Sequence, residues 1–190
     1  MKTRNILFKI IFLISSINGL HAGLKEDDQK FRDNFYKIID HYQEQLKKNP
    51  ENLKLTVAIA DVYYSLRDYS KAIEYYSKAL KLDPENIKIK TSLALSYLNN
   101  NDRISSQKLL EQVLKKDPHN LEALAGMGRF EALSHDYSKA EAYYQQVLSK
   151  NPYQFTTLFY LAEMRIEQKR YQEATALLEK LLKKIQKPFG

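Results

Sequence analysis

The sequence predicts an all-α protein, an α-α superhelix (solenoid) of four helix pairs preceded by one N-terminal helix. The main observation is that four of the five prolines recur every 34 residues, at Pro50, Pro84, Pro118 and Pro152. Proline cannot continue a helix and moves the preceding residue out of the helical region, so each of these prolines separates two helices. The segments between them are helix-forming, with only five glycines in the chain and no β-type alternation. A fixed period of this length is typical of a repeat array.

The first 22 residues (1–22) have the composition of a secretory signal peptide. Lys2 and Arg4 form a basic start, an apolar run follows at 10–17, and Ala22 precedes a plausible cleavage point. We therefore expect an exported protein, periplasmic or secreted. An uncleaved membrane anchor is the alternative and an ordinary helix a third, although the apolar stretch 6–20 is shorter than the roughly 20 residues of a spanning helix.

Charge and cysteine content narrow the function classes further. The formal net charge is +7, but Lys2, Arg4 and Lys9 belong to the leader, so the rest of the chain carries only +4. That mild charge does not indicate a nucleic-acid partner. The chain has no cysteine, which excludes disulfides, cysteine-based metal sites and lipid attachment to a cysteine after the leader. A membrane association is expected only if the leader is retained.

An amphipathic helix is predicted at 24–49, before the first proline. Its apolar residues recur every three or four positions: Phe31, Phe35, Ile38, Ile39, Tyr42 and Leu46. Terminal units of a repeat array need a polar outer face, so we expect this helix to cover the first helix pair.

Four aligned segments follow, at 53–86, 87–120, 121–154 and 155–188. They share a pattern of large, small and aromatic residues, which in the first segment is Ile59, Ala60, Tyr63, Ala72, Tyr76 and Ala79. The second segment has Leu93, Ala94, Tyr97, Ser106, Leu110 and Val113 at the same positions. The series resembles the tetratricopeptide repeat (TPR), which implies pairs of antiparallel helices with small residues where the helices cross. The later segments depart from it, because Glu131 and Arg165 replace the aromatic of Tyr63 and Tyr97.

Polar residues at fixed positions are expected to cap the helices. Asn52, Asn86 and Asn120 each follow a proline and precede the first helix of a repeat. Asp68, Asp102 and Asp136 precede the second helix of the first three repeats, whereas the fourth repeat has Arg170 there and a weaker cap.

No motif indicates catalysis. Beyond the leader the histidines are His41, His119 and His135, and no two of them have metal-ligand spacing. A Gly-rich phosphate loop and a cysteine nucleophile are also missing, and most tyrosines occupy recurring repeat positions where packing explains them. We therefore expect a protein that is not an enzyme and that has no cofactor and no metal.

The TPR resemblance implies a concave groove, lined by the first helices of the repeats, that takes a segment of another protein. The groove residues expected from it are Lys54, Val57, Asp61, Tyr64, Lys88, Thr91, Leu95, Leu98, Arg129, Phe159, Glu163 and Ile166. This lining suits a mixed polar and apolar peptide rather than a strongly acidic one. Tyr64, Leu98 and Phe159 are expected to be binding hot spots. The positions at which some TPR adaptors clamp a terminal carboxylate hold Val57, Asp61, Ser92, Glu122 and Gly126, which do not match.

The last predicted helix carries a wide apolar stripe that nothing in the sequence covers. It consists of Leu177, Leu178, Leu181, Leu182 and Ile185. Uncovered apolar faces are interaction sites or solubility liabilities, so we expect self-association, giving a homo-oligomer, or a partner at this end. The alternative is that the last helix pair buries the stripe internally.

These observations together predict an exported, non-enzymatic scaffold or adaptor that binds a protein or peptide partner in its groove. A membrane-anchored assembly subunit that works mainly by oligomerisation is the alternative.

Overall fold

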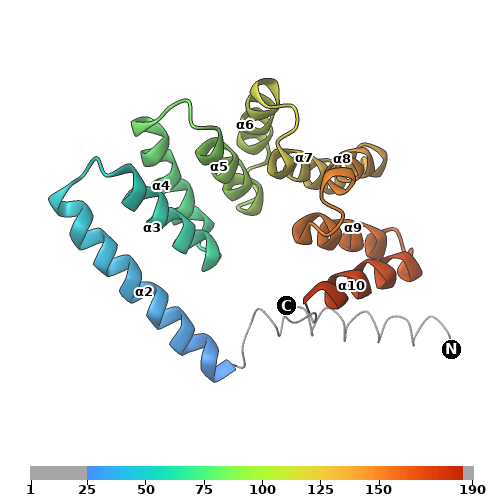
Figure 1. Cartoon of the computed structure of the whole chain (residues 1–190), viewed down its shortest axis with the longest axis horizontal. Coiled ribbons are helices and arrows are strands. Elements are labelled where there is room, and N and C mark those ends of the chain that lie inside the picture. The colour runs from blue at the N-terminus through green and yellow to red at the C-terminus, as the bar shows by residue number, and fades with distance from the viewer. Residues whose placement is uncertain (1–24, 186–190) are drawn as a thin grey trace. The chain divides into compact units, whose positions relative to one another are not determined.

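The computed structural model describes residues 25–185, and in this range the chain forms nine α-helices and no strand. The helices are α2 (Lys25–Lys48), α3 (Leu53–Ser65), α4 (Tyr69–Leu82), α5 (Ile87–Asn99), α6 (Arg103–Lys116), α7 (Leu121–Leu133), α8 (Tyr137–Lys150), α9 (Phe155–Glu167) and α10 (Tyr171–Ile185). Figure 1 shows them as successive helix pairs after α2, so the predicted all-α solenoid is confirmed. The signal peptide expected at 1–22 lies outside the described residues.

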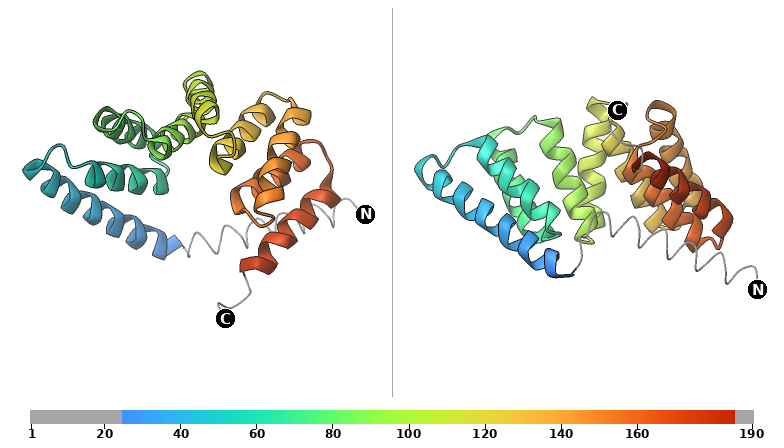
Figure 2. Two further views of the ribbon diagram at one scale, coloured as in Figure 1. Left: turned by 45° about the horizontal axis from the view of Figure 1, so that its top comes forward. Right: turned by 60° about the horizontal axis from the view of Figure 1, so that its bottom comes forward.

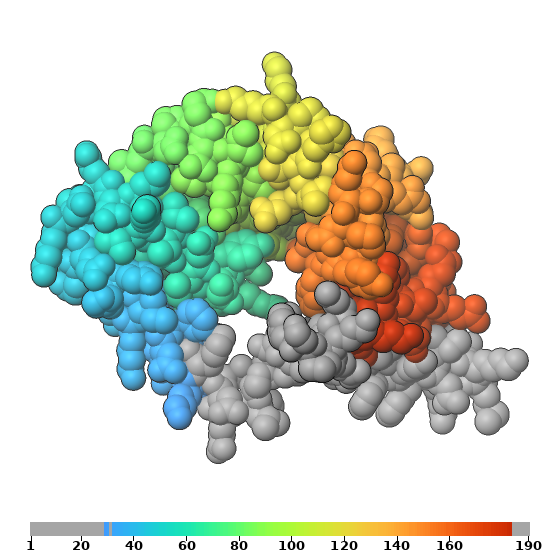
Figure 3. Space-filling model, viewed as in Figure 1, coloured from blue at the N-terminus to red at the C-terminus, as the bar shows by residue number. Residues whose placement is uncertain are grey.

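The chain divides into two compact units, residues 26–126 and the residues from Met127 onward. In the first unit α2 lies beside the α3/α4 pair, and the α5/α6 pair follows (Figures 1 and 2). Ile39 of α2 is buried in one core with Ile59, Tyr63 and Tyr76. Burying an isoleucine contributes about 1.5–3 kcal/mol relative to leaving it exposed. Side chains of α2 and the first pair form one continuous surface in Figure 3, so α2 covers that pair.

The caps expected from the sequence are confirmed. Asn52 accepts a hydrogen bond from the Leu55 N–H at 3.1 Å, and Asp68 accepts one from the Lys71 N–H at 3.2 Å. The equivalent caps form at Asn86, Asn120, Asp102 and Asp136. Gln154 caps α9 in the same way, through a 2.7 Å hydrogen bond from the Thr157 N–H, which the sequence analysis did not predict. Each cap satisfies one of the free N–H groups at a helix start.

The turns inside the repeats have a backbone conformation that the sequence did not reveal. Arg67, Asn101, His135 and Lys169 have φ values of 61°, 65°, 61° and 61°. In the first turn the Asp68 N–H donates to the Tyr63 carbonyl at 2.9 Å, which closes a Schellman-type helix end. Glycine usually occupies this left-handed position, because it lacks the Cβ that crowds there. Here four non-glycine residues adopt it at one repeat position.

The second unit contains the end of α7 together with α8, α9 and α10. Gly128 of α7 faces the ring of Tyr144 on α8 so closely that a Cβ at this position would lie 2.5 Å from Tyr144 Cε1. The other three repeats have alanine here, at Ala60, Ala94 and Ala162. Glycine at this position therefore makes room for the fully buried Tyr144 ring.

Arg165 occupies the repeat position that holds the aromatic residues Tyr63 and Tyr97 in the first two repeats. Its side chain is buried, and its Nε lies 3.1 Å from a carboxylate oxygen of Glu173 on α10. The same guanidinium pairs with Glu141 of α8 and donates to Gln168 Oε1 at 2.9 Å. A buried cation needs such partners, because an unpaired one carries a large desolvation cost. One arginine thus ties α8, α9 and α10 together.

The apolar stripe expected on α10 is mostly internal, which corrects the sequence-based expectation. Leu178 and Leu181 are only 1% and 2% exposed, in one core with Leu158 and Ala162 of α9. They are therefore unavailable for assembly. Leu177 and Leu182 are half-buried and pack against the same core, and the side chain of Ile185 lies outside the described residues.

Candidate partner-binding pocket

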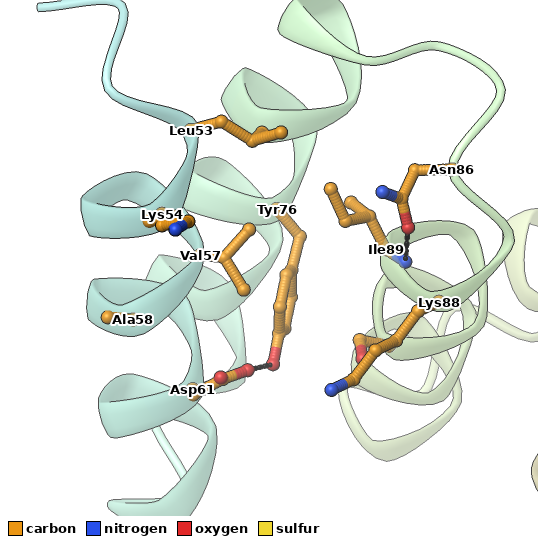
Figure 4. A pocket seen from close by; sticks show the side chains of 10 residues that line it. Leu53, Lys54, Val57, Ala58, Asp61, Tyr76, Asn86, Lys88 and Ile89 are labelled. Atoms are coloured by element: carbon orange, nitrogen blue, oxygen red, sulfur yellow. Dashed lines mark hydrogen bonds between the residues drawn. The ribbon is translucent and has the colours of Figure 1, made fainter.

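A pocket of about 290 Å³ opens between α3 and α5 in the first unit, with Tyr76 of α4 behind it (Figure 4). Its lining is Leu53, Lys54, Val57, Ala58, Asp61, Tyr76, Asn86, Lys88, Ile89 and Ser92. Its volume is just below the range of about 300–1,000 Å³ found for small-molecule pockets. The space therefore suits one bulky side chain better than a large ligand.

The walls of the pocket are apolar. Leu53 and Val57 are four residues apart on α3, so both point to the same side of that helix. Ile89 faces them from α5, where the Asn86 cap fixes the first turn by accepting from the Ile89 N–H at 3.1 Å. An apolar side chain of a partner that packs against these walls would be removed from water, which favours binding.

The floor of the pocket holds a buried hydroxyl and a carboxylate. The Tyr76 hydroxyl donates a hydrogen bond to Asp61 Oδ1. Burial, followed by this hydrogen bond, raises the pKa of Tyr76 far above its ordinary value. Tyr76 is therefore a neutral donor, and Asp61 has a fixed partner inside the protein (Figure 4).

Two lysines flank the pocket, Lys54 from α3 and Lys88 from α5 (Figure 4). Both are exposed, and neither has an ion pair or hydrogen bond within residues 25–185. Nearby acidic side chains are engaged elsewhere: Glu85 pairs with Lys90 at 3.7 Å and with Lys116, and Asp83 accepts from Asn86. The pocket is thus an apolar cavity between two unpaired cations.

The structure brings four of the twelve expected groove residues together in this pocket: Lys54, Val57, Asp61 and Lys88. Thr91 and Leu98 are only 0% and 4% exposed, so the expectation that they face a groove, and that Leu98 is a hot spot, is corrected. The Thr91 hydroxyl donates back to the Ile87 carbonyl at 2.9 Å. Tyr64 is half-buried and accepts from Asn99 Nδ2 at 2.9 Å, and Leu95 lies over Gly126.

The other four expected groove residues belong to the second unit. Arg129 donates to the Tyr160 hydroxyl at 2.7 Å, and its Cζ lies 4.4 Å from the centre of that ring. Phe159 stacks on Phe155 with ring centres 6.3 Å apart, and Ile166 packs on the core of the last pair. Desolvation raises the pKa of Glu163, and Arg129 acts in the opposite direction.

Sequence reasoning missed several pocket residues, among them Tyr76, Asn86 and Ile89. Tyr76 was interpreted as packing only, although its hydroxyl reaches Asp61 fifteen positions earlier in the chain. A tyrosine one helix away from an aspartate in the same repeat is a signal that could have suggested the pair. Ile89 carried no such signal, because its part in the pocket depends on how the second repeat packs against the first.

The described part of the chain has neither a cluster of metal-ligating side chains nor a helix that could span a membrane. No group of three or more His, Cys, Asp or Glu side chains there could hold a metal ion. Among the helices α2 to α10, none has the length and hydropathy required to cross a membrane.

Comparison of the fold with solved structures finds TPR proteins. A fragment described as MamA 41-end from Desulfovibrio magneticus RS-1 is 16% identical, with a TM-score of 0.60 over 96% of this chain and 98% of that one. YrrB, described as a TPR protein with an unusual peptide-binding site, is 15% identical, with a TM-score of 0.55 over 80% and 78%. The first TPR of Spaghetti (RPAP3), bound to an HSP90 peptide, is 19% identical, with a TM-score of 0.52 over 65% and 93%. At these identities the likeness shows the fold alone.

Sequence comparison shows the family. No curated protein matches the chain. A family profile described as tetratricopeptide repeat matches residues 131–188. A second profile, described as the cytochrome c-type biogenesis protein H TPR domain, matches residues 42–152, which is more than half of the chain. The protein therefore belongs to the tetratricopeptide-repeat family, in the group of cytochrome c-type biogenesis protein H TPR domains.

Proposed function

We propose that the protein is a non-enzymatic scaffold that binds a segment of a partner protein, with the α3/α5 pocket as the main anchor point. The observation that carries the proposal is the pocket itself, an apolar cavity of about 290 Å³ opening between the first helices of two neighbouring repeats. YrrB and the Spaghetti domain, whose descriptions mention peptide binding, add support from the same fold. A buried side chain of the partner would supply most of the affinity, as hot spots do.

The test is a selection of peptides from a random ten-residue library on the intact protein, followed by affinity measurement on the wild type and on Val57→Asp. Val57 lies in the pocket wall, so binding of an apolar peptide side chain would remove the new carboxylate from water without giving it a partner, which weakens binding. We expect selected peptides to bind Val57→Asp at least about tenfold more weakly, the loss of roughly one hot-spot contact.

The matched control is Ile104→Asp, because it makes the same type of change at a residue that is 84% exposed on α6, outside the pocket. Both variants should keep the helical circular dichroism of the wild type. Equal affinities of the wild type and a folded Val57→Asp for every selected peptide would exclude the pocket as the anchor.

We further propose that the protein is exported and that its leader (1–22) is removed. The basic start and apolar run of the sequence support this, and a retained leader would instead favour a membrane-anchored assembly subunit. Intact mass spectrometry of the native protein decides between them. A chain that begins near Gly23 supports export, and a full-length chain in the membrane fraction contradicts it.

Self-association through the end of α10 is also part of the proposal, in a reduced form. Among the stripe residues whose side chains the structure describes, the half-buried Leu177 and Leu182 remain as candidate contacts. Light scattering of the wild type and of Leu177→Lys tests this, since a dimer that the substitution dissociates is the expected result. A wild type that is monomeric at high concentration would remove self-association from the account.

A further inference from the structure

We propose that the α3/α5 pocket selects an internal motif in which an apolar side chain is flanked by acidic residues. The inference rests on the proposed function, because it assigns the chemistry of the segment that the pocket would bind. The apolar side chain would enter between Val57 and Ile89, and the flanking carboxylates would meet Lys54 and Lys88.

The pocket carries an excess of positive charge. Lys54 and Lys88 have no ion pair within residues 25–185, whereas the pocket's own acid, Asp61, accepts the Tyr76 hydroxyl. Asp61 keeps its negative charge, because its partner is neutral, so the two lysines and Asp61 together leave an excess of one positive charge at the pocket. A partner with carboxylates beside its apolar anchor would complement this arrangement, and a basic partner would be repelled.

The two lysines lie at equivalent positions on either side of the pocket. Each is the second residue of its repeat's first helix, which places one on each of the two helices that flank the pocket. The same position holds Glu122 and Thr156 in the third and fourth repeats. Lysine at this position is thus found only in the first two of the four repeats, and the pocket opens between these two repeats.

The size and lining of the pocket limit what can enter it. A cavity of about 290 Å³ with Leu53, Val57, Ala58 and Ile89 in its walls has room for one large apolar side chain. The carboxylates of the motif must therefore remain at the rim, where both lysines are exposed. Exposed ion pairs contribute modestly, so each should improve binding by about two- to fivefold.

The experiment selects from the same random ten-residue library on the wild type and on the charge-reversed variant Lys54→Glu/Lys88→Glu, and then sequences the retained peptides. On the wild type we expect aspartate and glutamate next to an apolar residue to be enriched about threefold or more over the starting library. On the reversed variant lysine and arginine should be enriched there instead. High salt should weaken both preferences, since it screens exposed charges.

The control is Lys108→Glu/Lys115→Glu, which changes the net charge equally at two exposed lysines of α6 outside the pocket. It should keep the acidic preference of the wild type. Lys54→Ser/Lys88→Ser adds no negative charge, so it should lose the acidic preference without reversing it. This variant replaces Lys54→Glu/Lys88→Glu if the charge-reversed protein does not fold.

The outcomes separate the two proposals. Enrichment of apolar residues without neighbouring acids would overturn the charge inference and leave the pocket's binding role intact. An acidic preference that persists in a folded Lys54→Ser/Lys88→Ser protein would also overturn the inference. A library that shows no apolar enrichment on the wild type would overturn the proposed function together with it.

Discussion

Tyr76 and Tyr144 occupy the same repeat position but have opposite hydrogen-bonding situations. The Tyr76 hydroxyl donates to Asp61, whereas the buried Tyr144 hydroxyl has no hydrogen-bond partner in the described part of the chain. The residue that corresponds to Asp61 in the third repeat is Arg129, which donates to Tyr160 instead. A change at one residue position therefore decides whether the tyrosine hydroxyl is satisfied.

This difference predicts the effect of removing each hydroxyl. Tyr76→Phe should lower the free energy of unfolding by about 1–3 kcal/mol, because it loses a hydrogen bond to a charged group. Tyr144→Phe should leave the stability unchanged or raise it by about 1 kcal/mol, because it removes an unsatisfied buried polar atom. Urea unfolding measures both, and equal destabilisation by the two changes would contradict the structure.

Glu163 predicts a dependence of stability on pH. Desolvation raises the pKa of Glu163 above its unfolded value, so the folded protein holds the proton more tightly than the unfolded chain does. The associated stability is fully present below the unfolded pKa of about 4.3 and is lost as the pH rises through the folded pKa. Glu163 is exposed at the surface, so solvent weakens this effect. Glu163→Gln should therefore be only slightly more stable than the wild type at pH 7, with the gain disappearing near pH 4.

Thermal unfolding at both pH values measures the Glu163→Gln effect, and Glu167→Gln on the same helix is a control for the loss of one charge. Glu167→Gln removes one negative charge from the same helix, so it should not produce the same pH-dependent gain. A Glu163→Gln protein that is less stable than the wild type at pH 7 would show that the carboxylate, through Arg129, stabilises the fold.

Among the secondary-structure elements, the turn inside each repeat ends its first helix with a left-handed residue. Lys169 adopts φ = 61° and Asn101 adopts φ = 65° at the same repeat position. Asparagine tolerates this region better than most residues, whereas lysine is strained there by roughly 1–2 kcal/mol. The turn is kept because Asp102 and Arg170 donate N–H groups to the helix ends, at 2.9 Å and 2.8 Å.

Lys169→Gly should therefore raise the free energy of unfolding by about 0.5–1 kcal/mol, because glycine has no Cβ to crowd the left-handed position. Asn101→Gly should change it by only a few tenths, since asparagine already tolerates the conformation. Chemical denaturation of the two variants makes the comparison. A loss of stability in Lys169→Gly would mean that its side-chain contacts outweigh the backbone strain.

At the scale of the whole molecule, the sequence predicted the architecture because that architecture depends on local signals. Prolines, capping residues such as Asn52 and Asp68, and the apolar period act within a few residues of the chain, and the described helices follow them. The left-handed residues were missed because arginine and lysine, at two of the four positions, do not favour that conformation, so the composition of the turn gave no consistent signal.

The candidate site was predicted only in part, because it depends on contacts between helices. Four of the expected groove residues, Lys54, Val57, Asp61 and Lys88, line one pocket, but Thr91, expected in the same groove, is buried. A repeat alignment gives the face of a helix only approximately, whereas burial is set by how closely the next helix packs. Leu178 and Leu181 were misassigned to an open stripe for the same reason, since α9 covers them.

The proposed function depends on the α3/α5 pocket anchoring a partner segment. The most direct test is a nuclear magnetic resonance titration of the methyl-labelled protein with a peptide selected from the random library. We predict that the largest shifts arise at Leu53, Val57, Ala58 and Ile89, with little change at Ile104 on α6. Shifts concentrated elsewhere, with the methyl groups of these four residues unchanged at saturation, would contradict this claim.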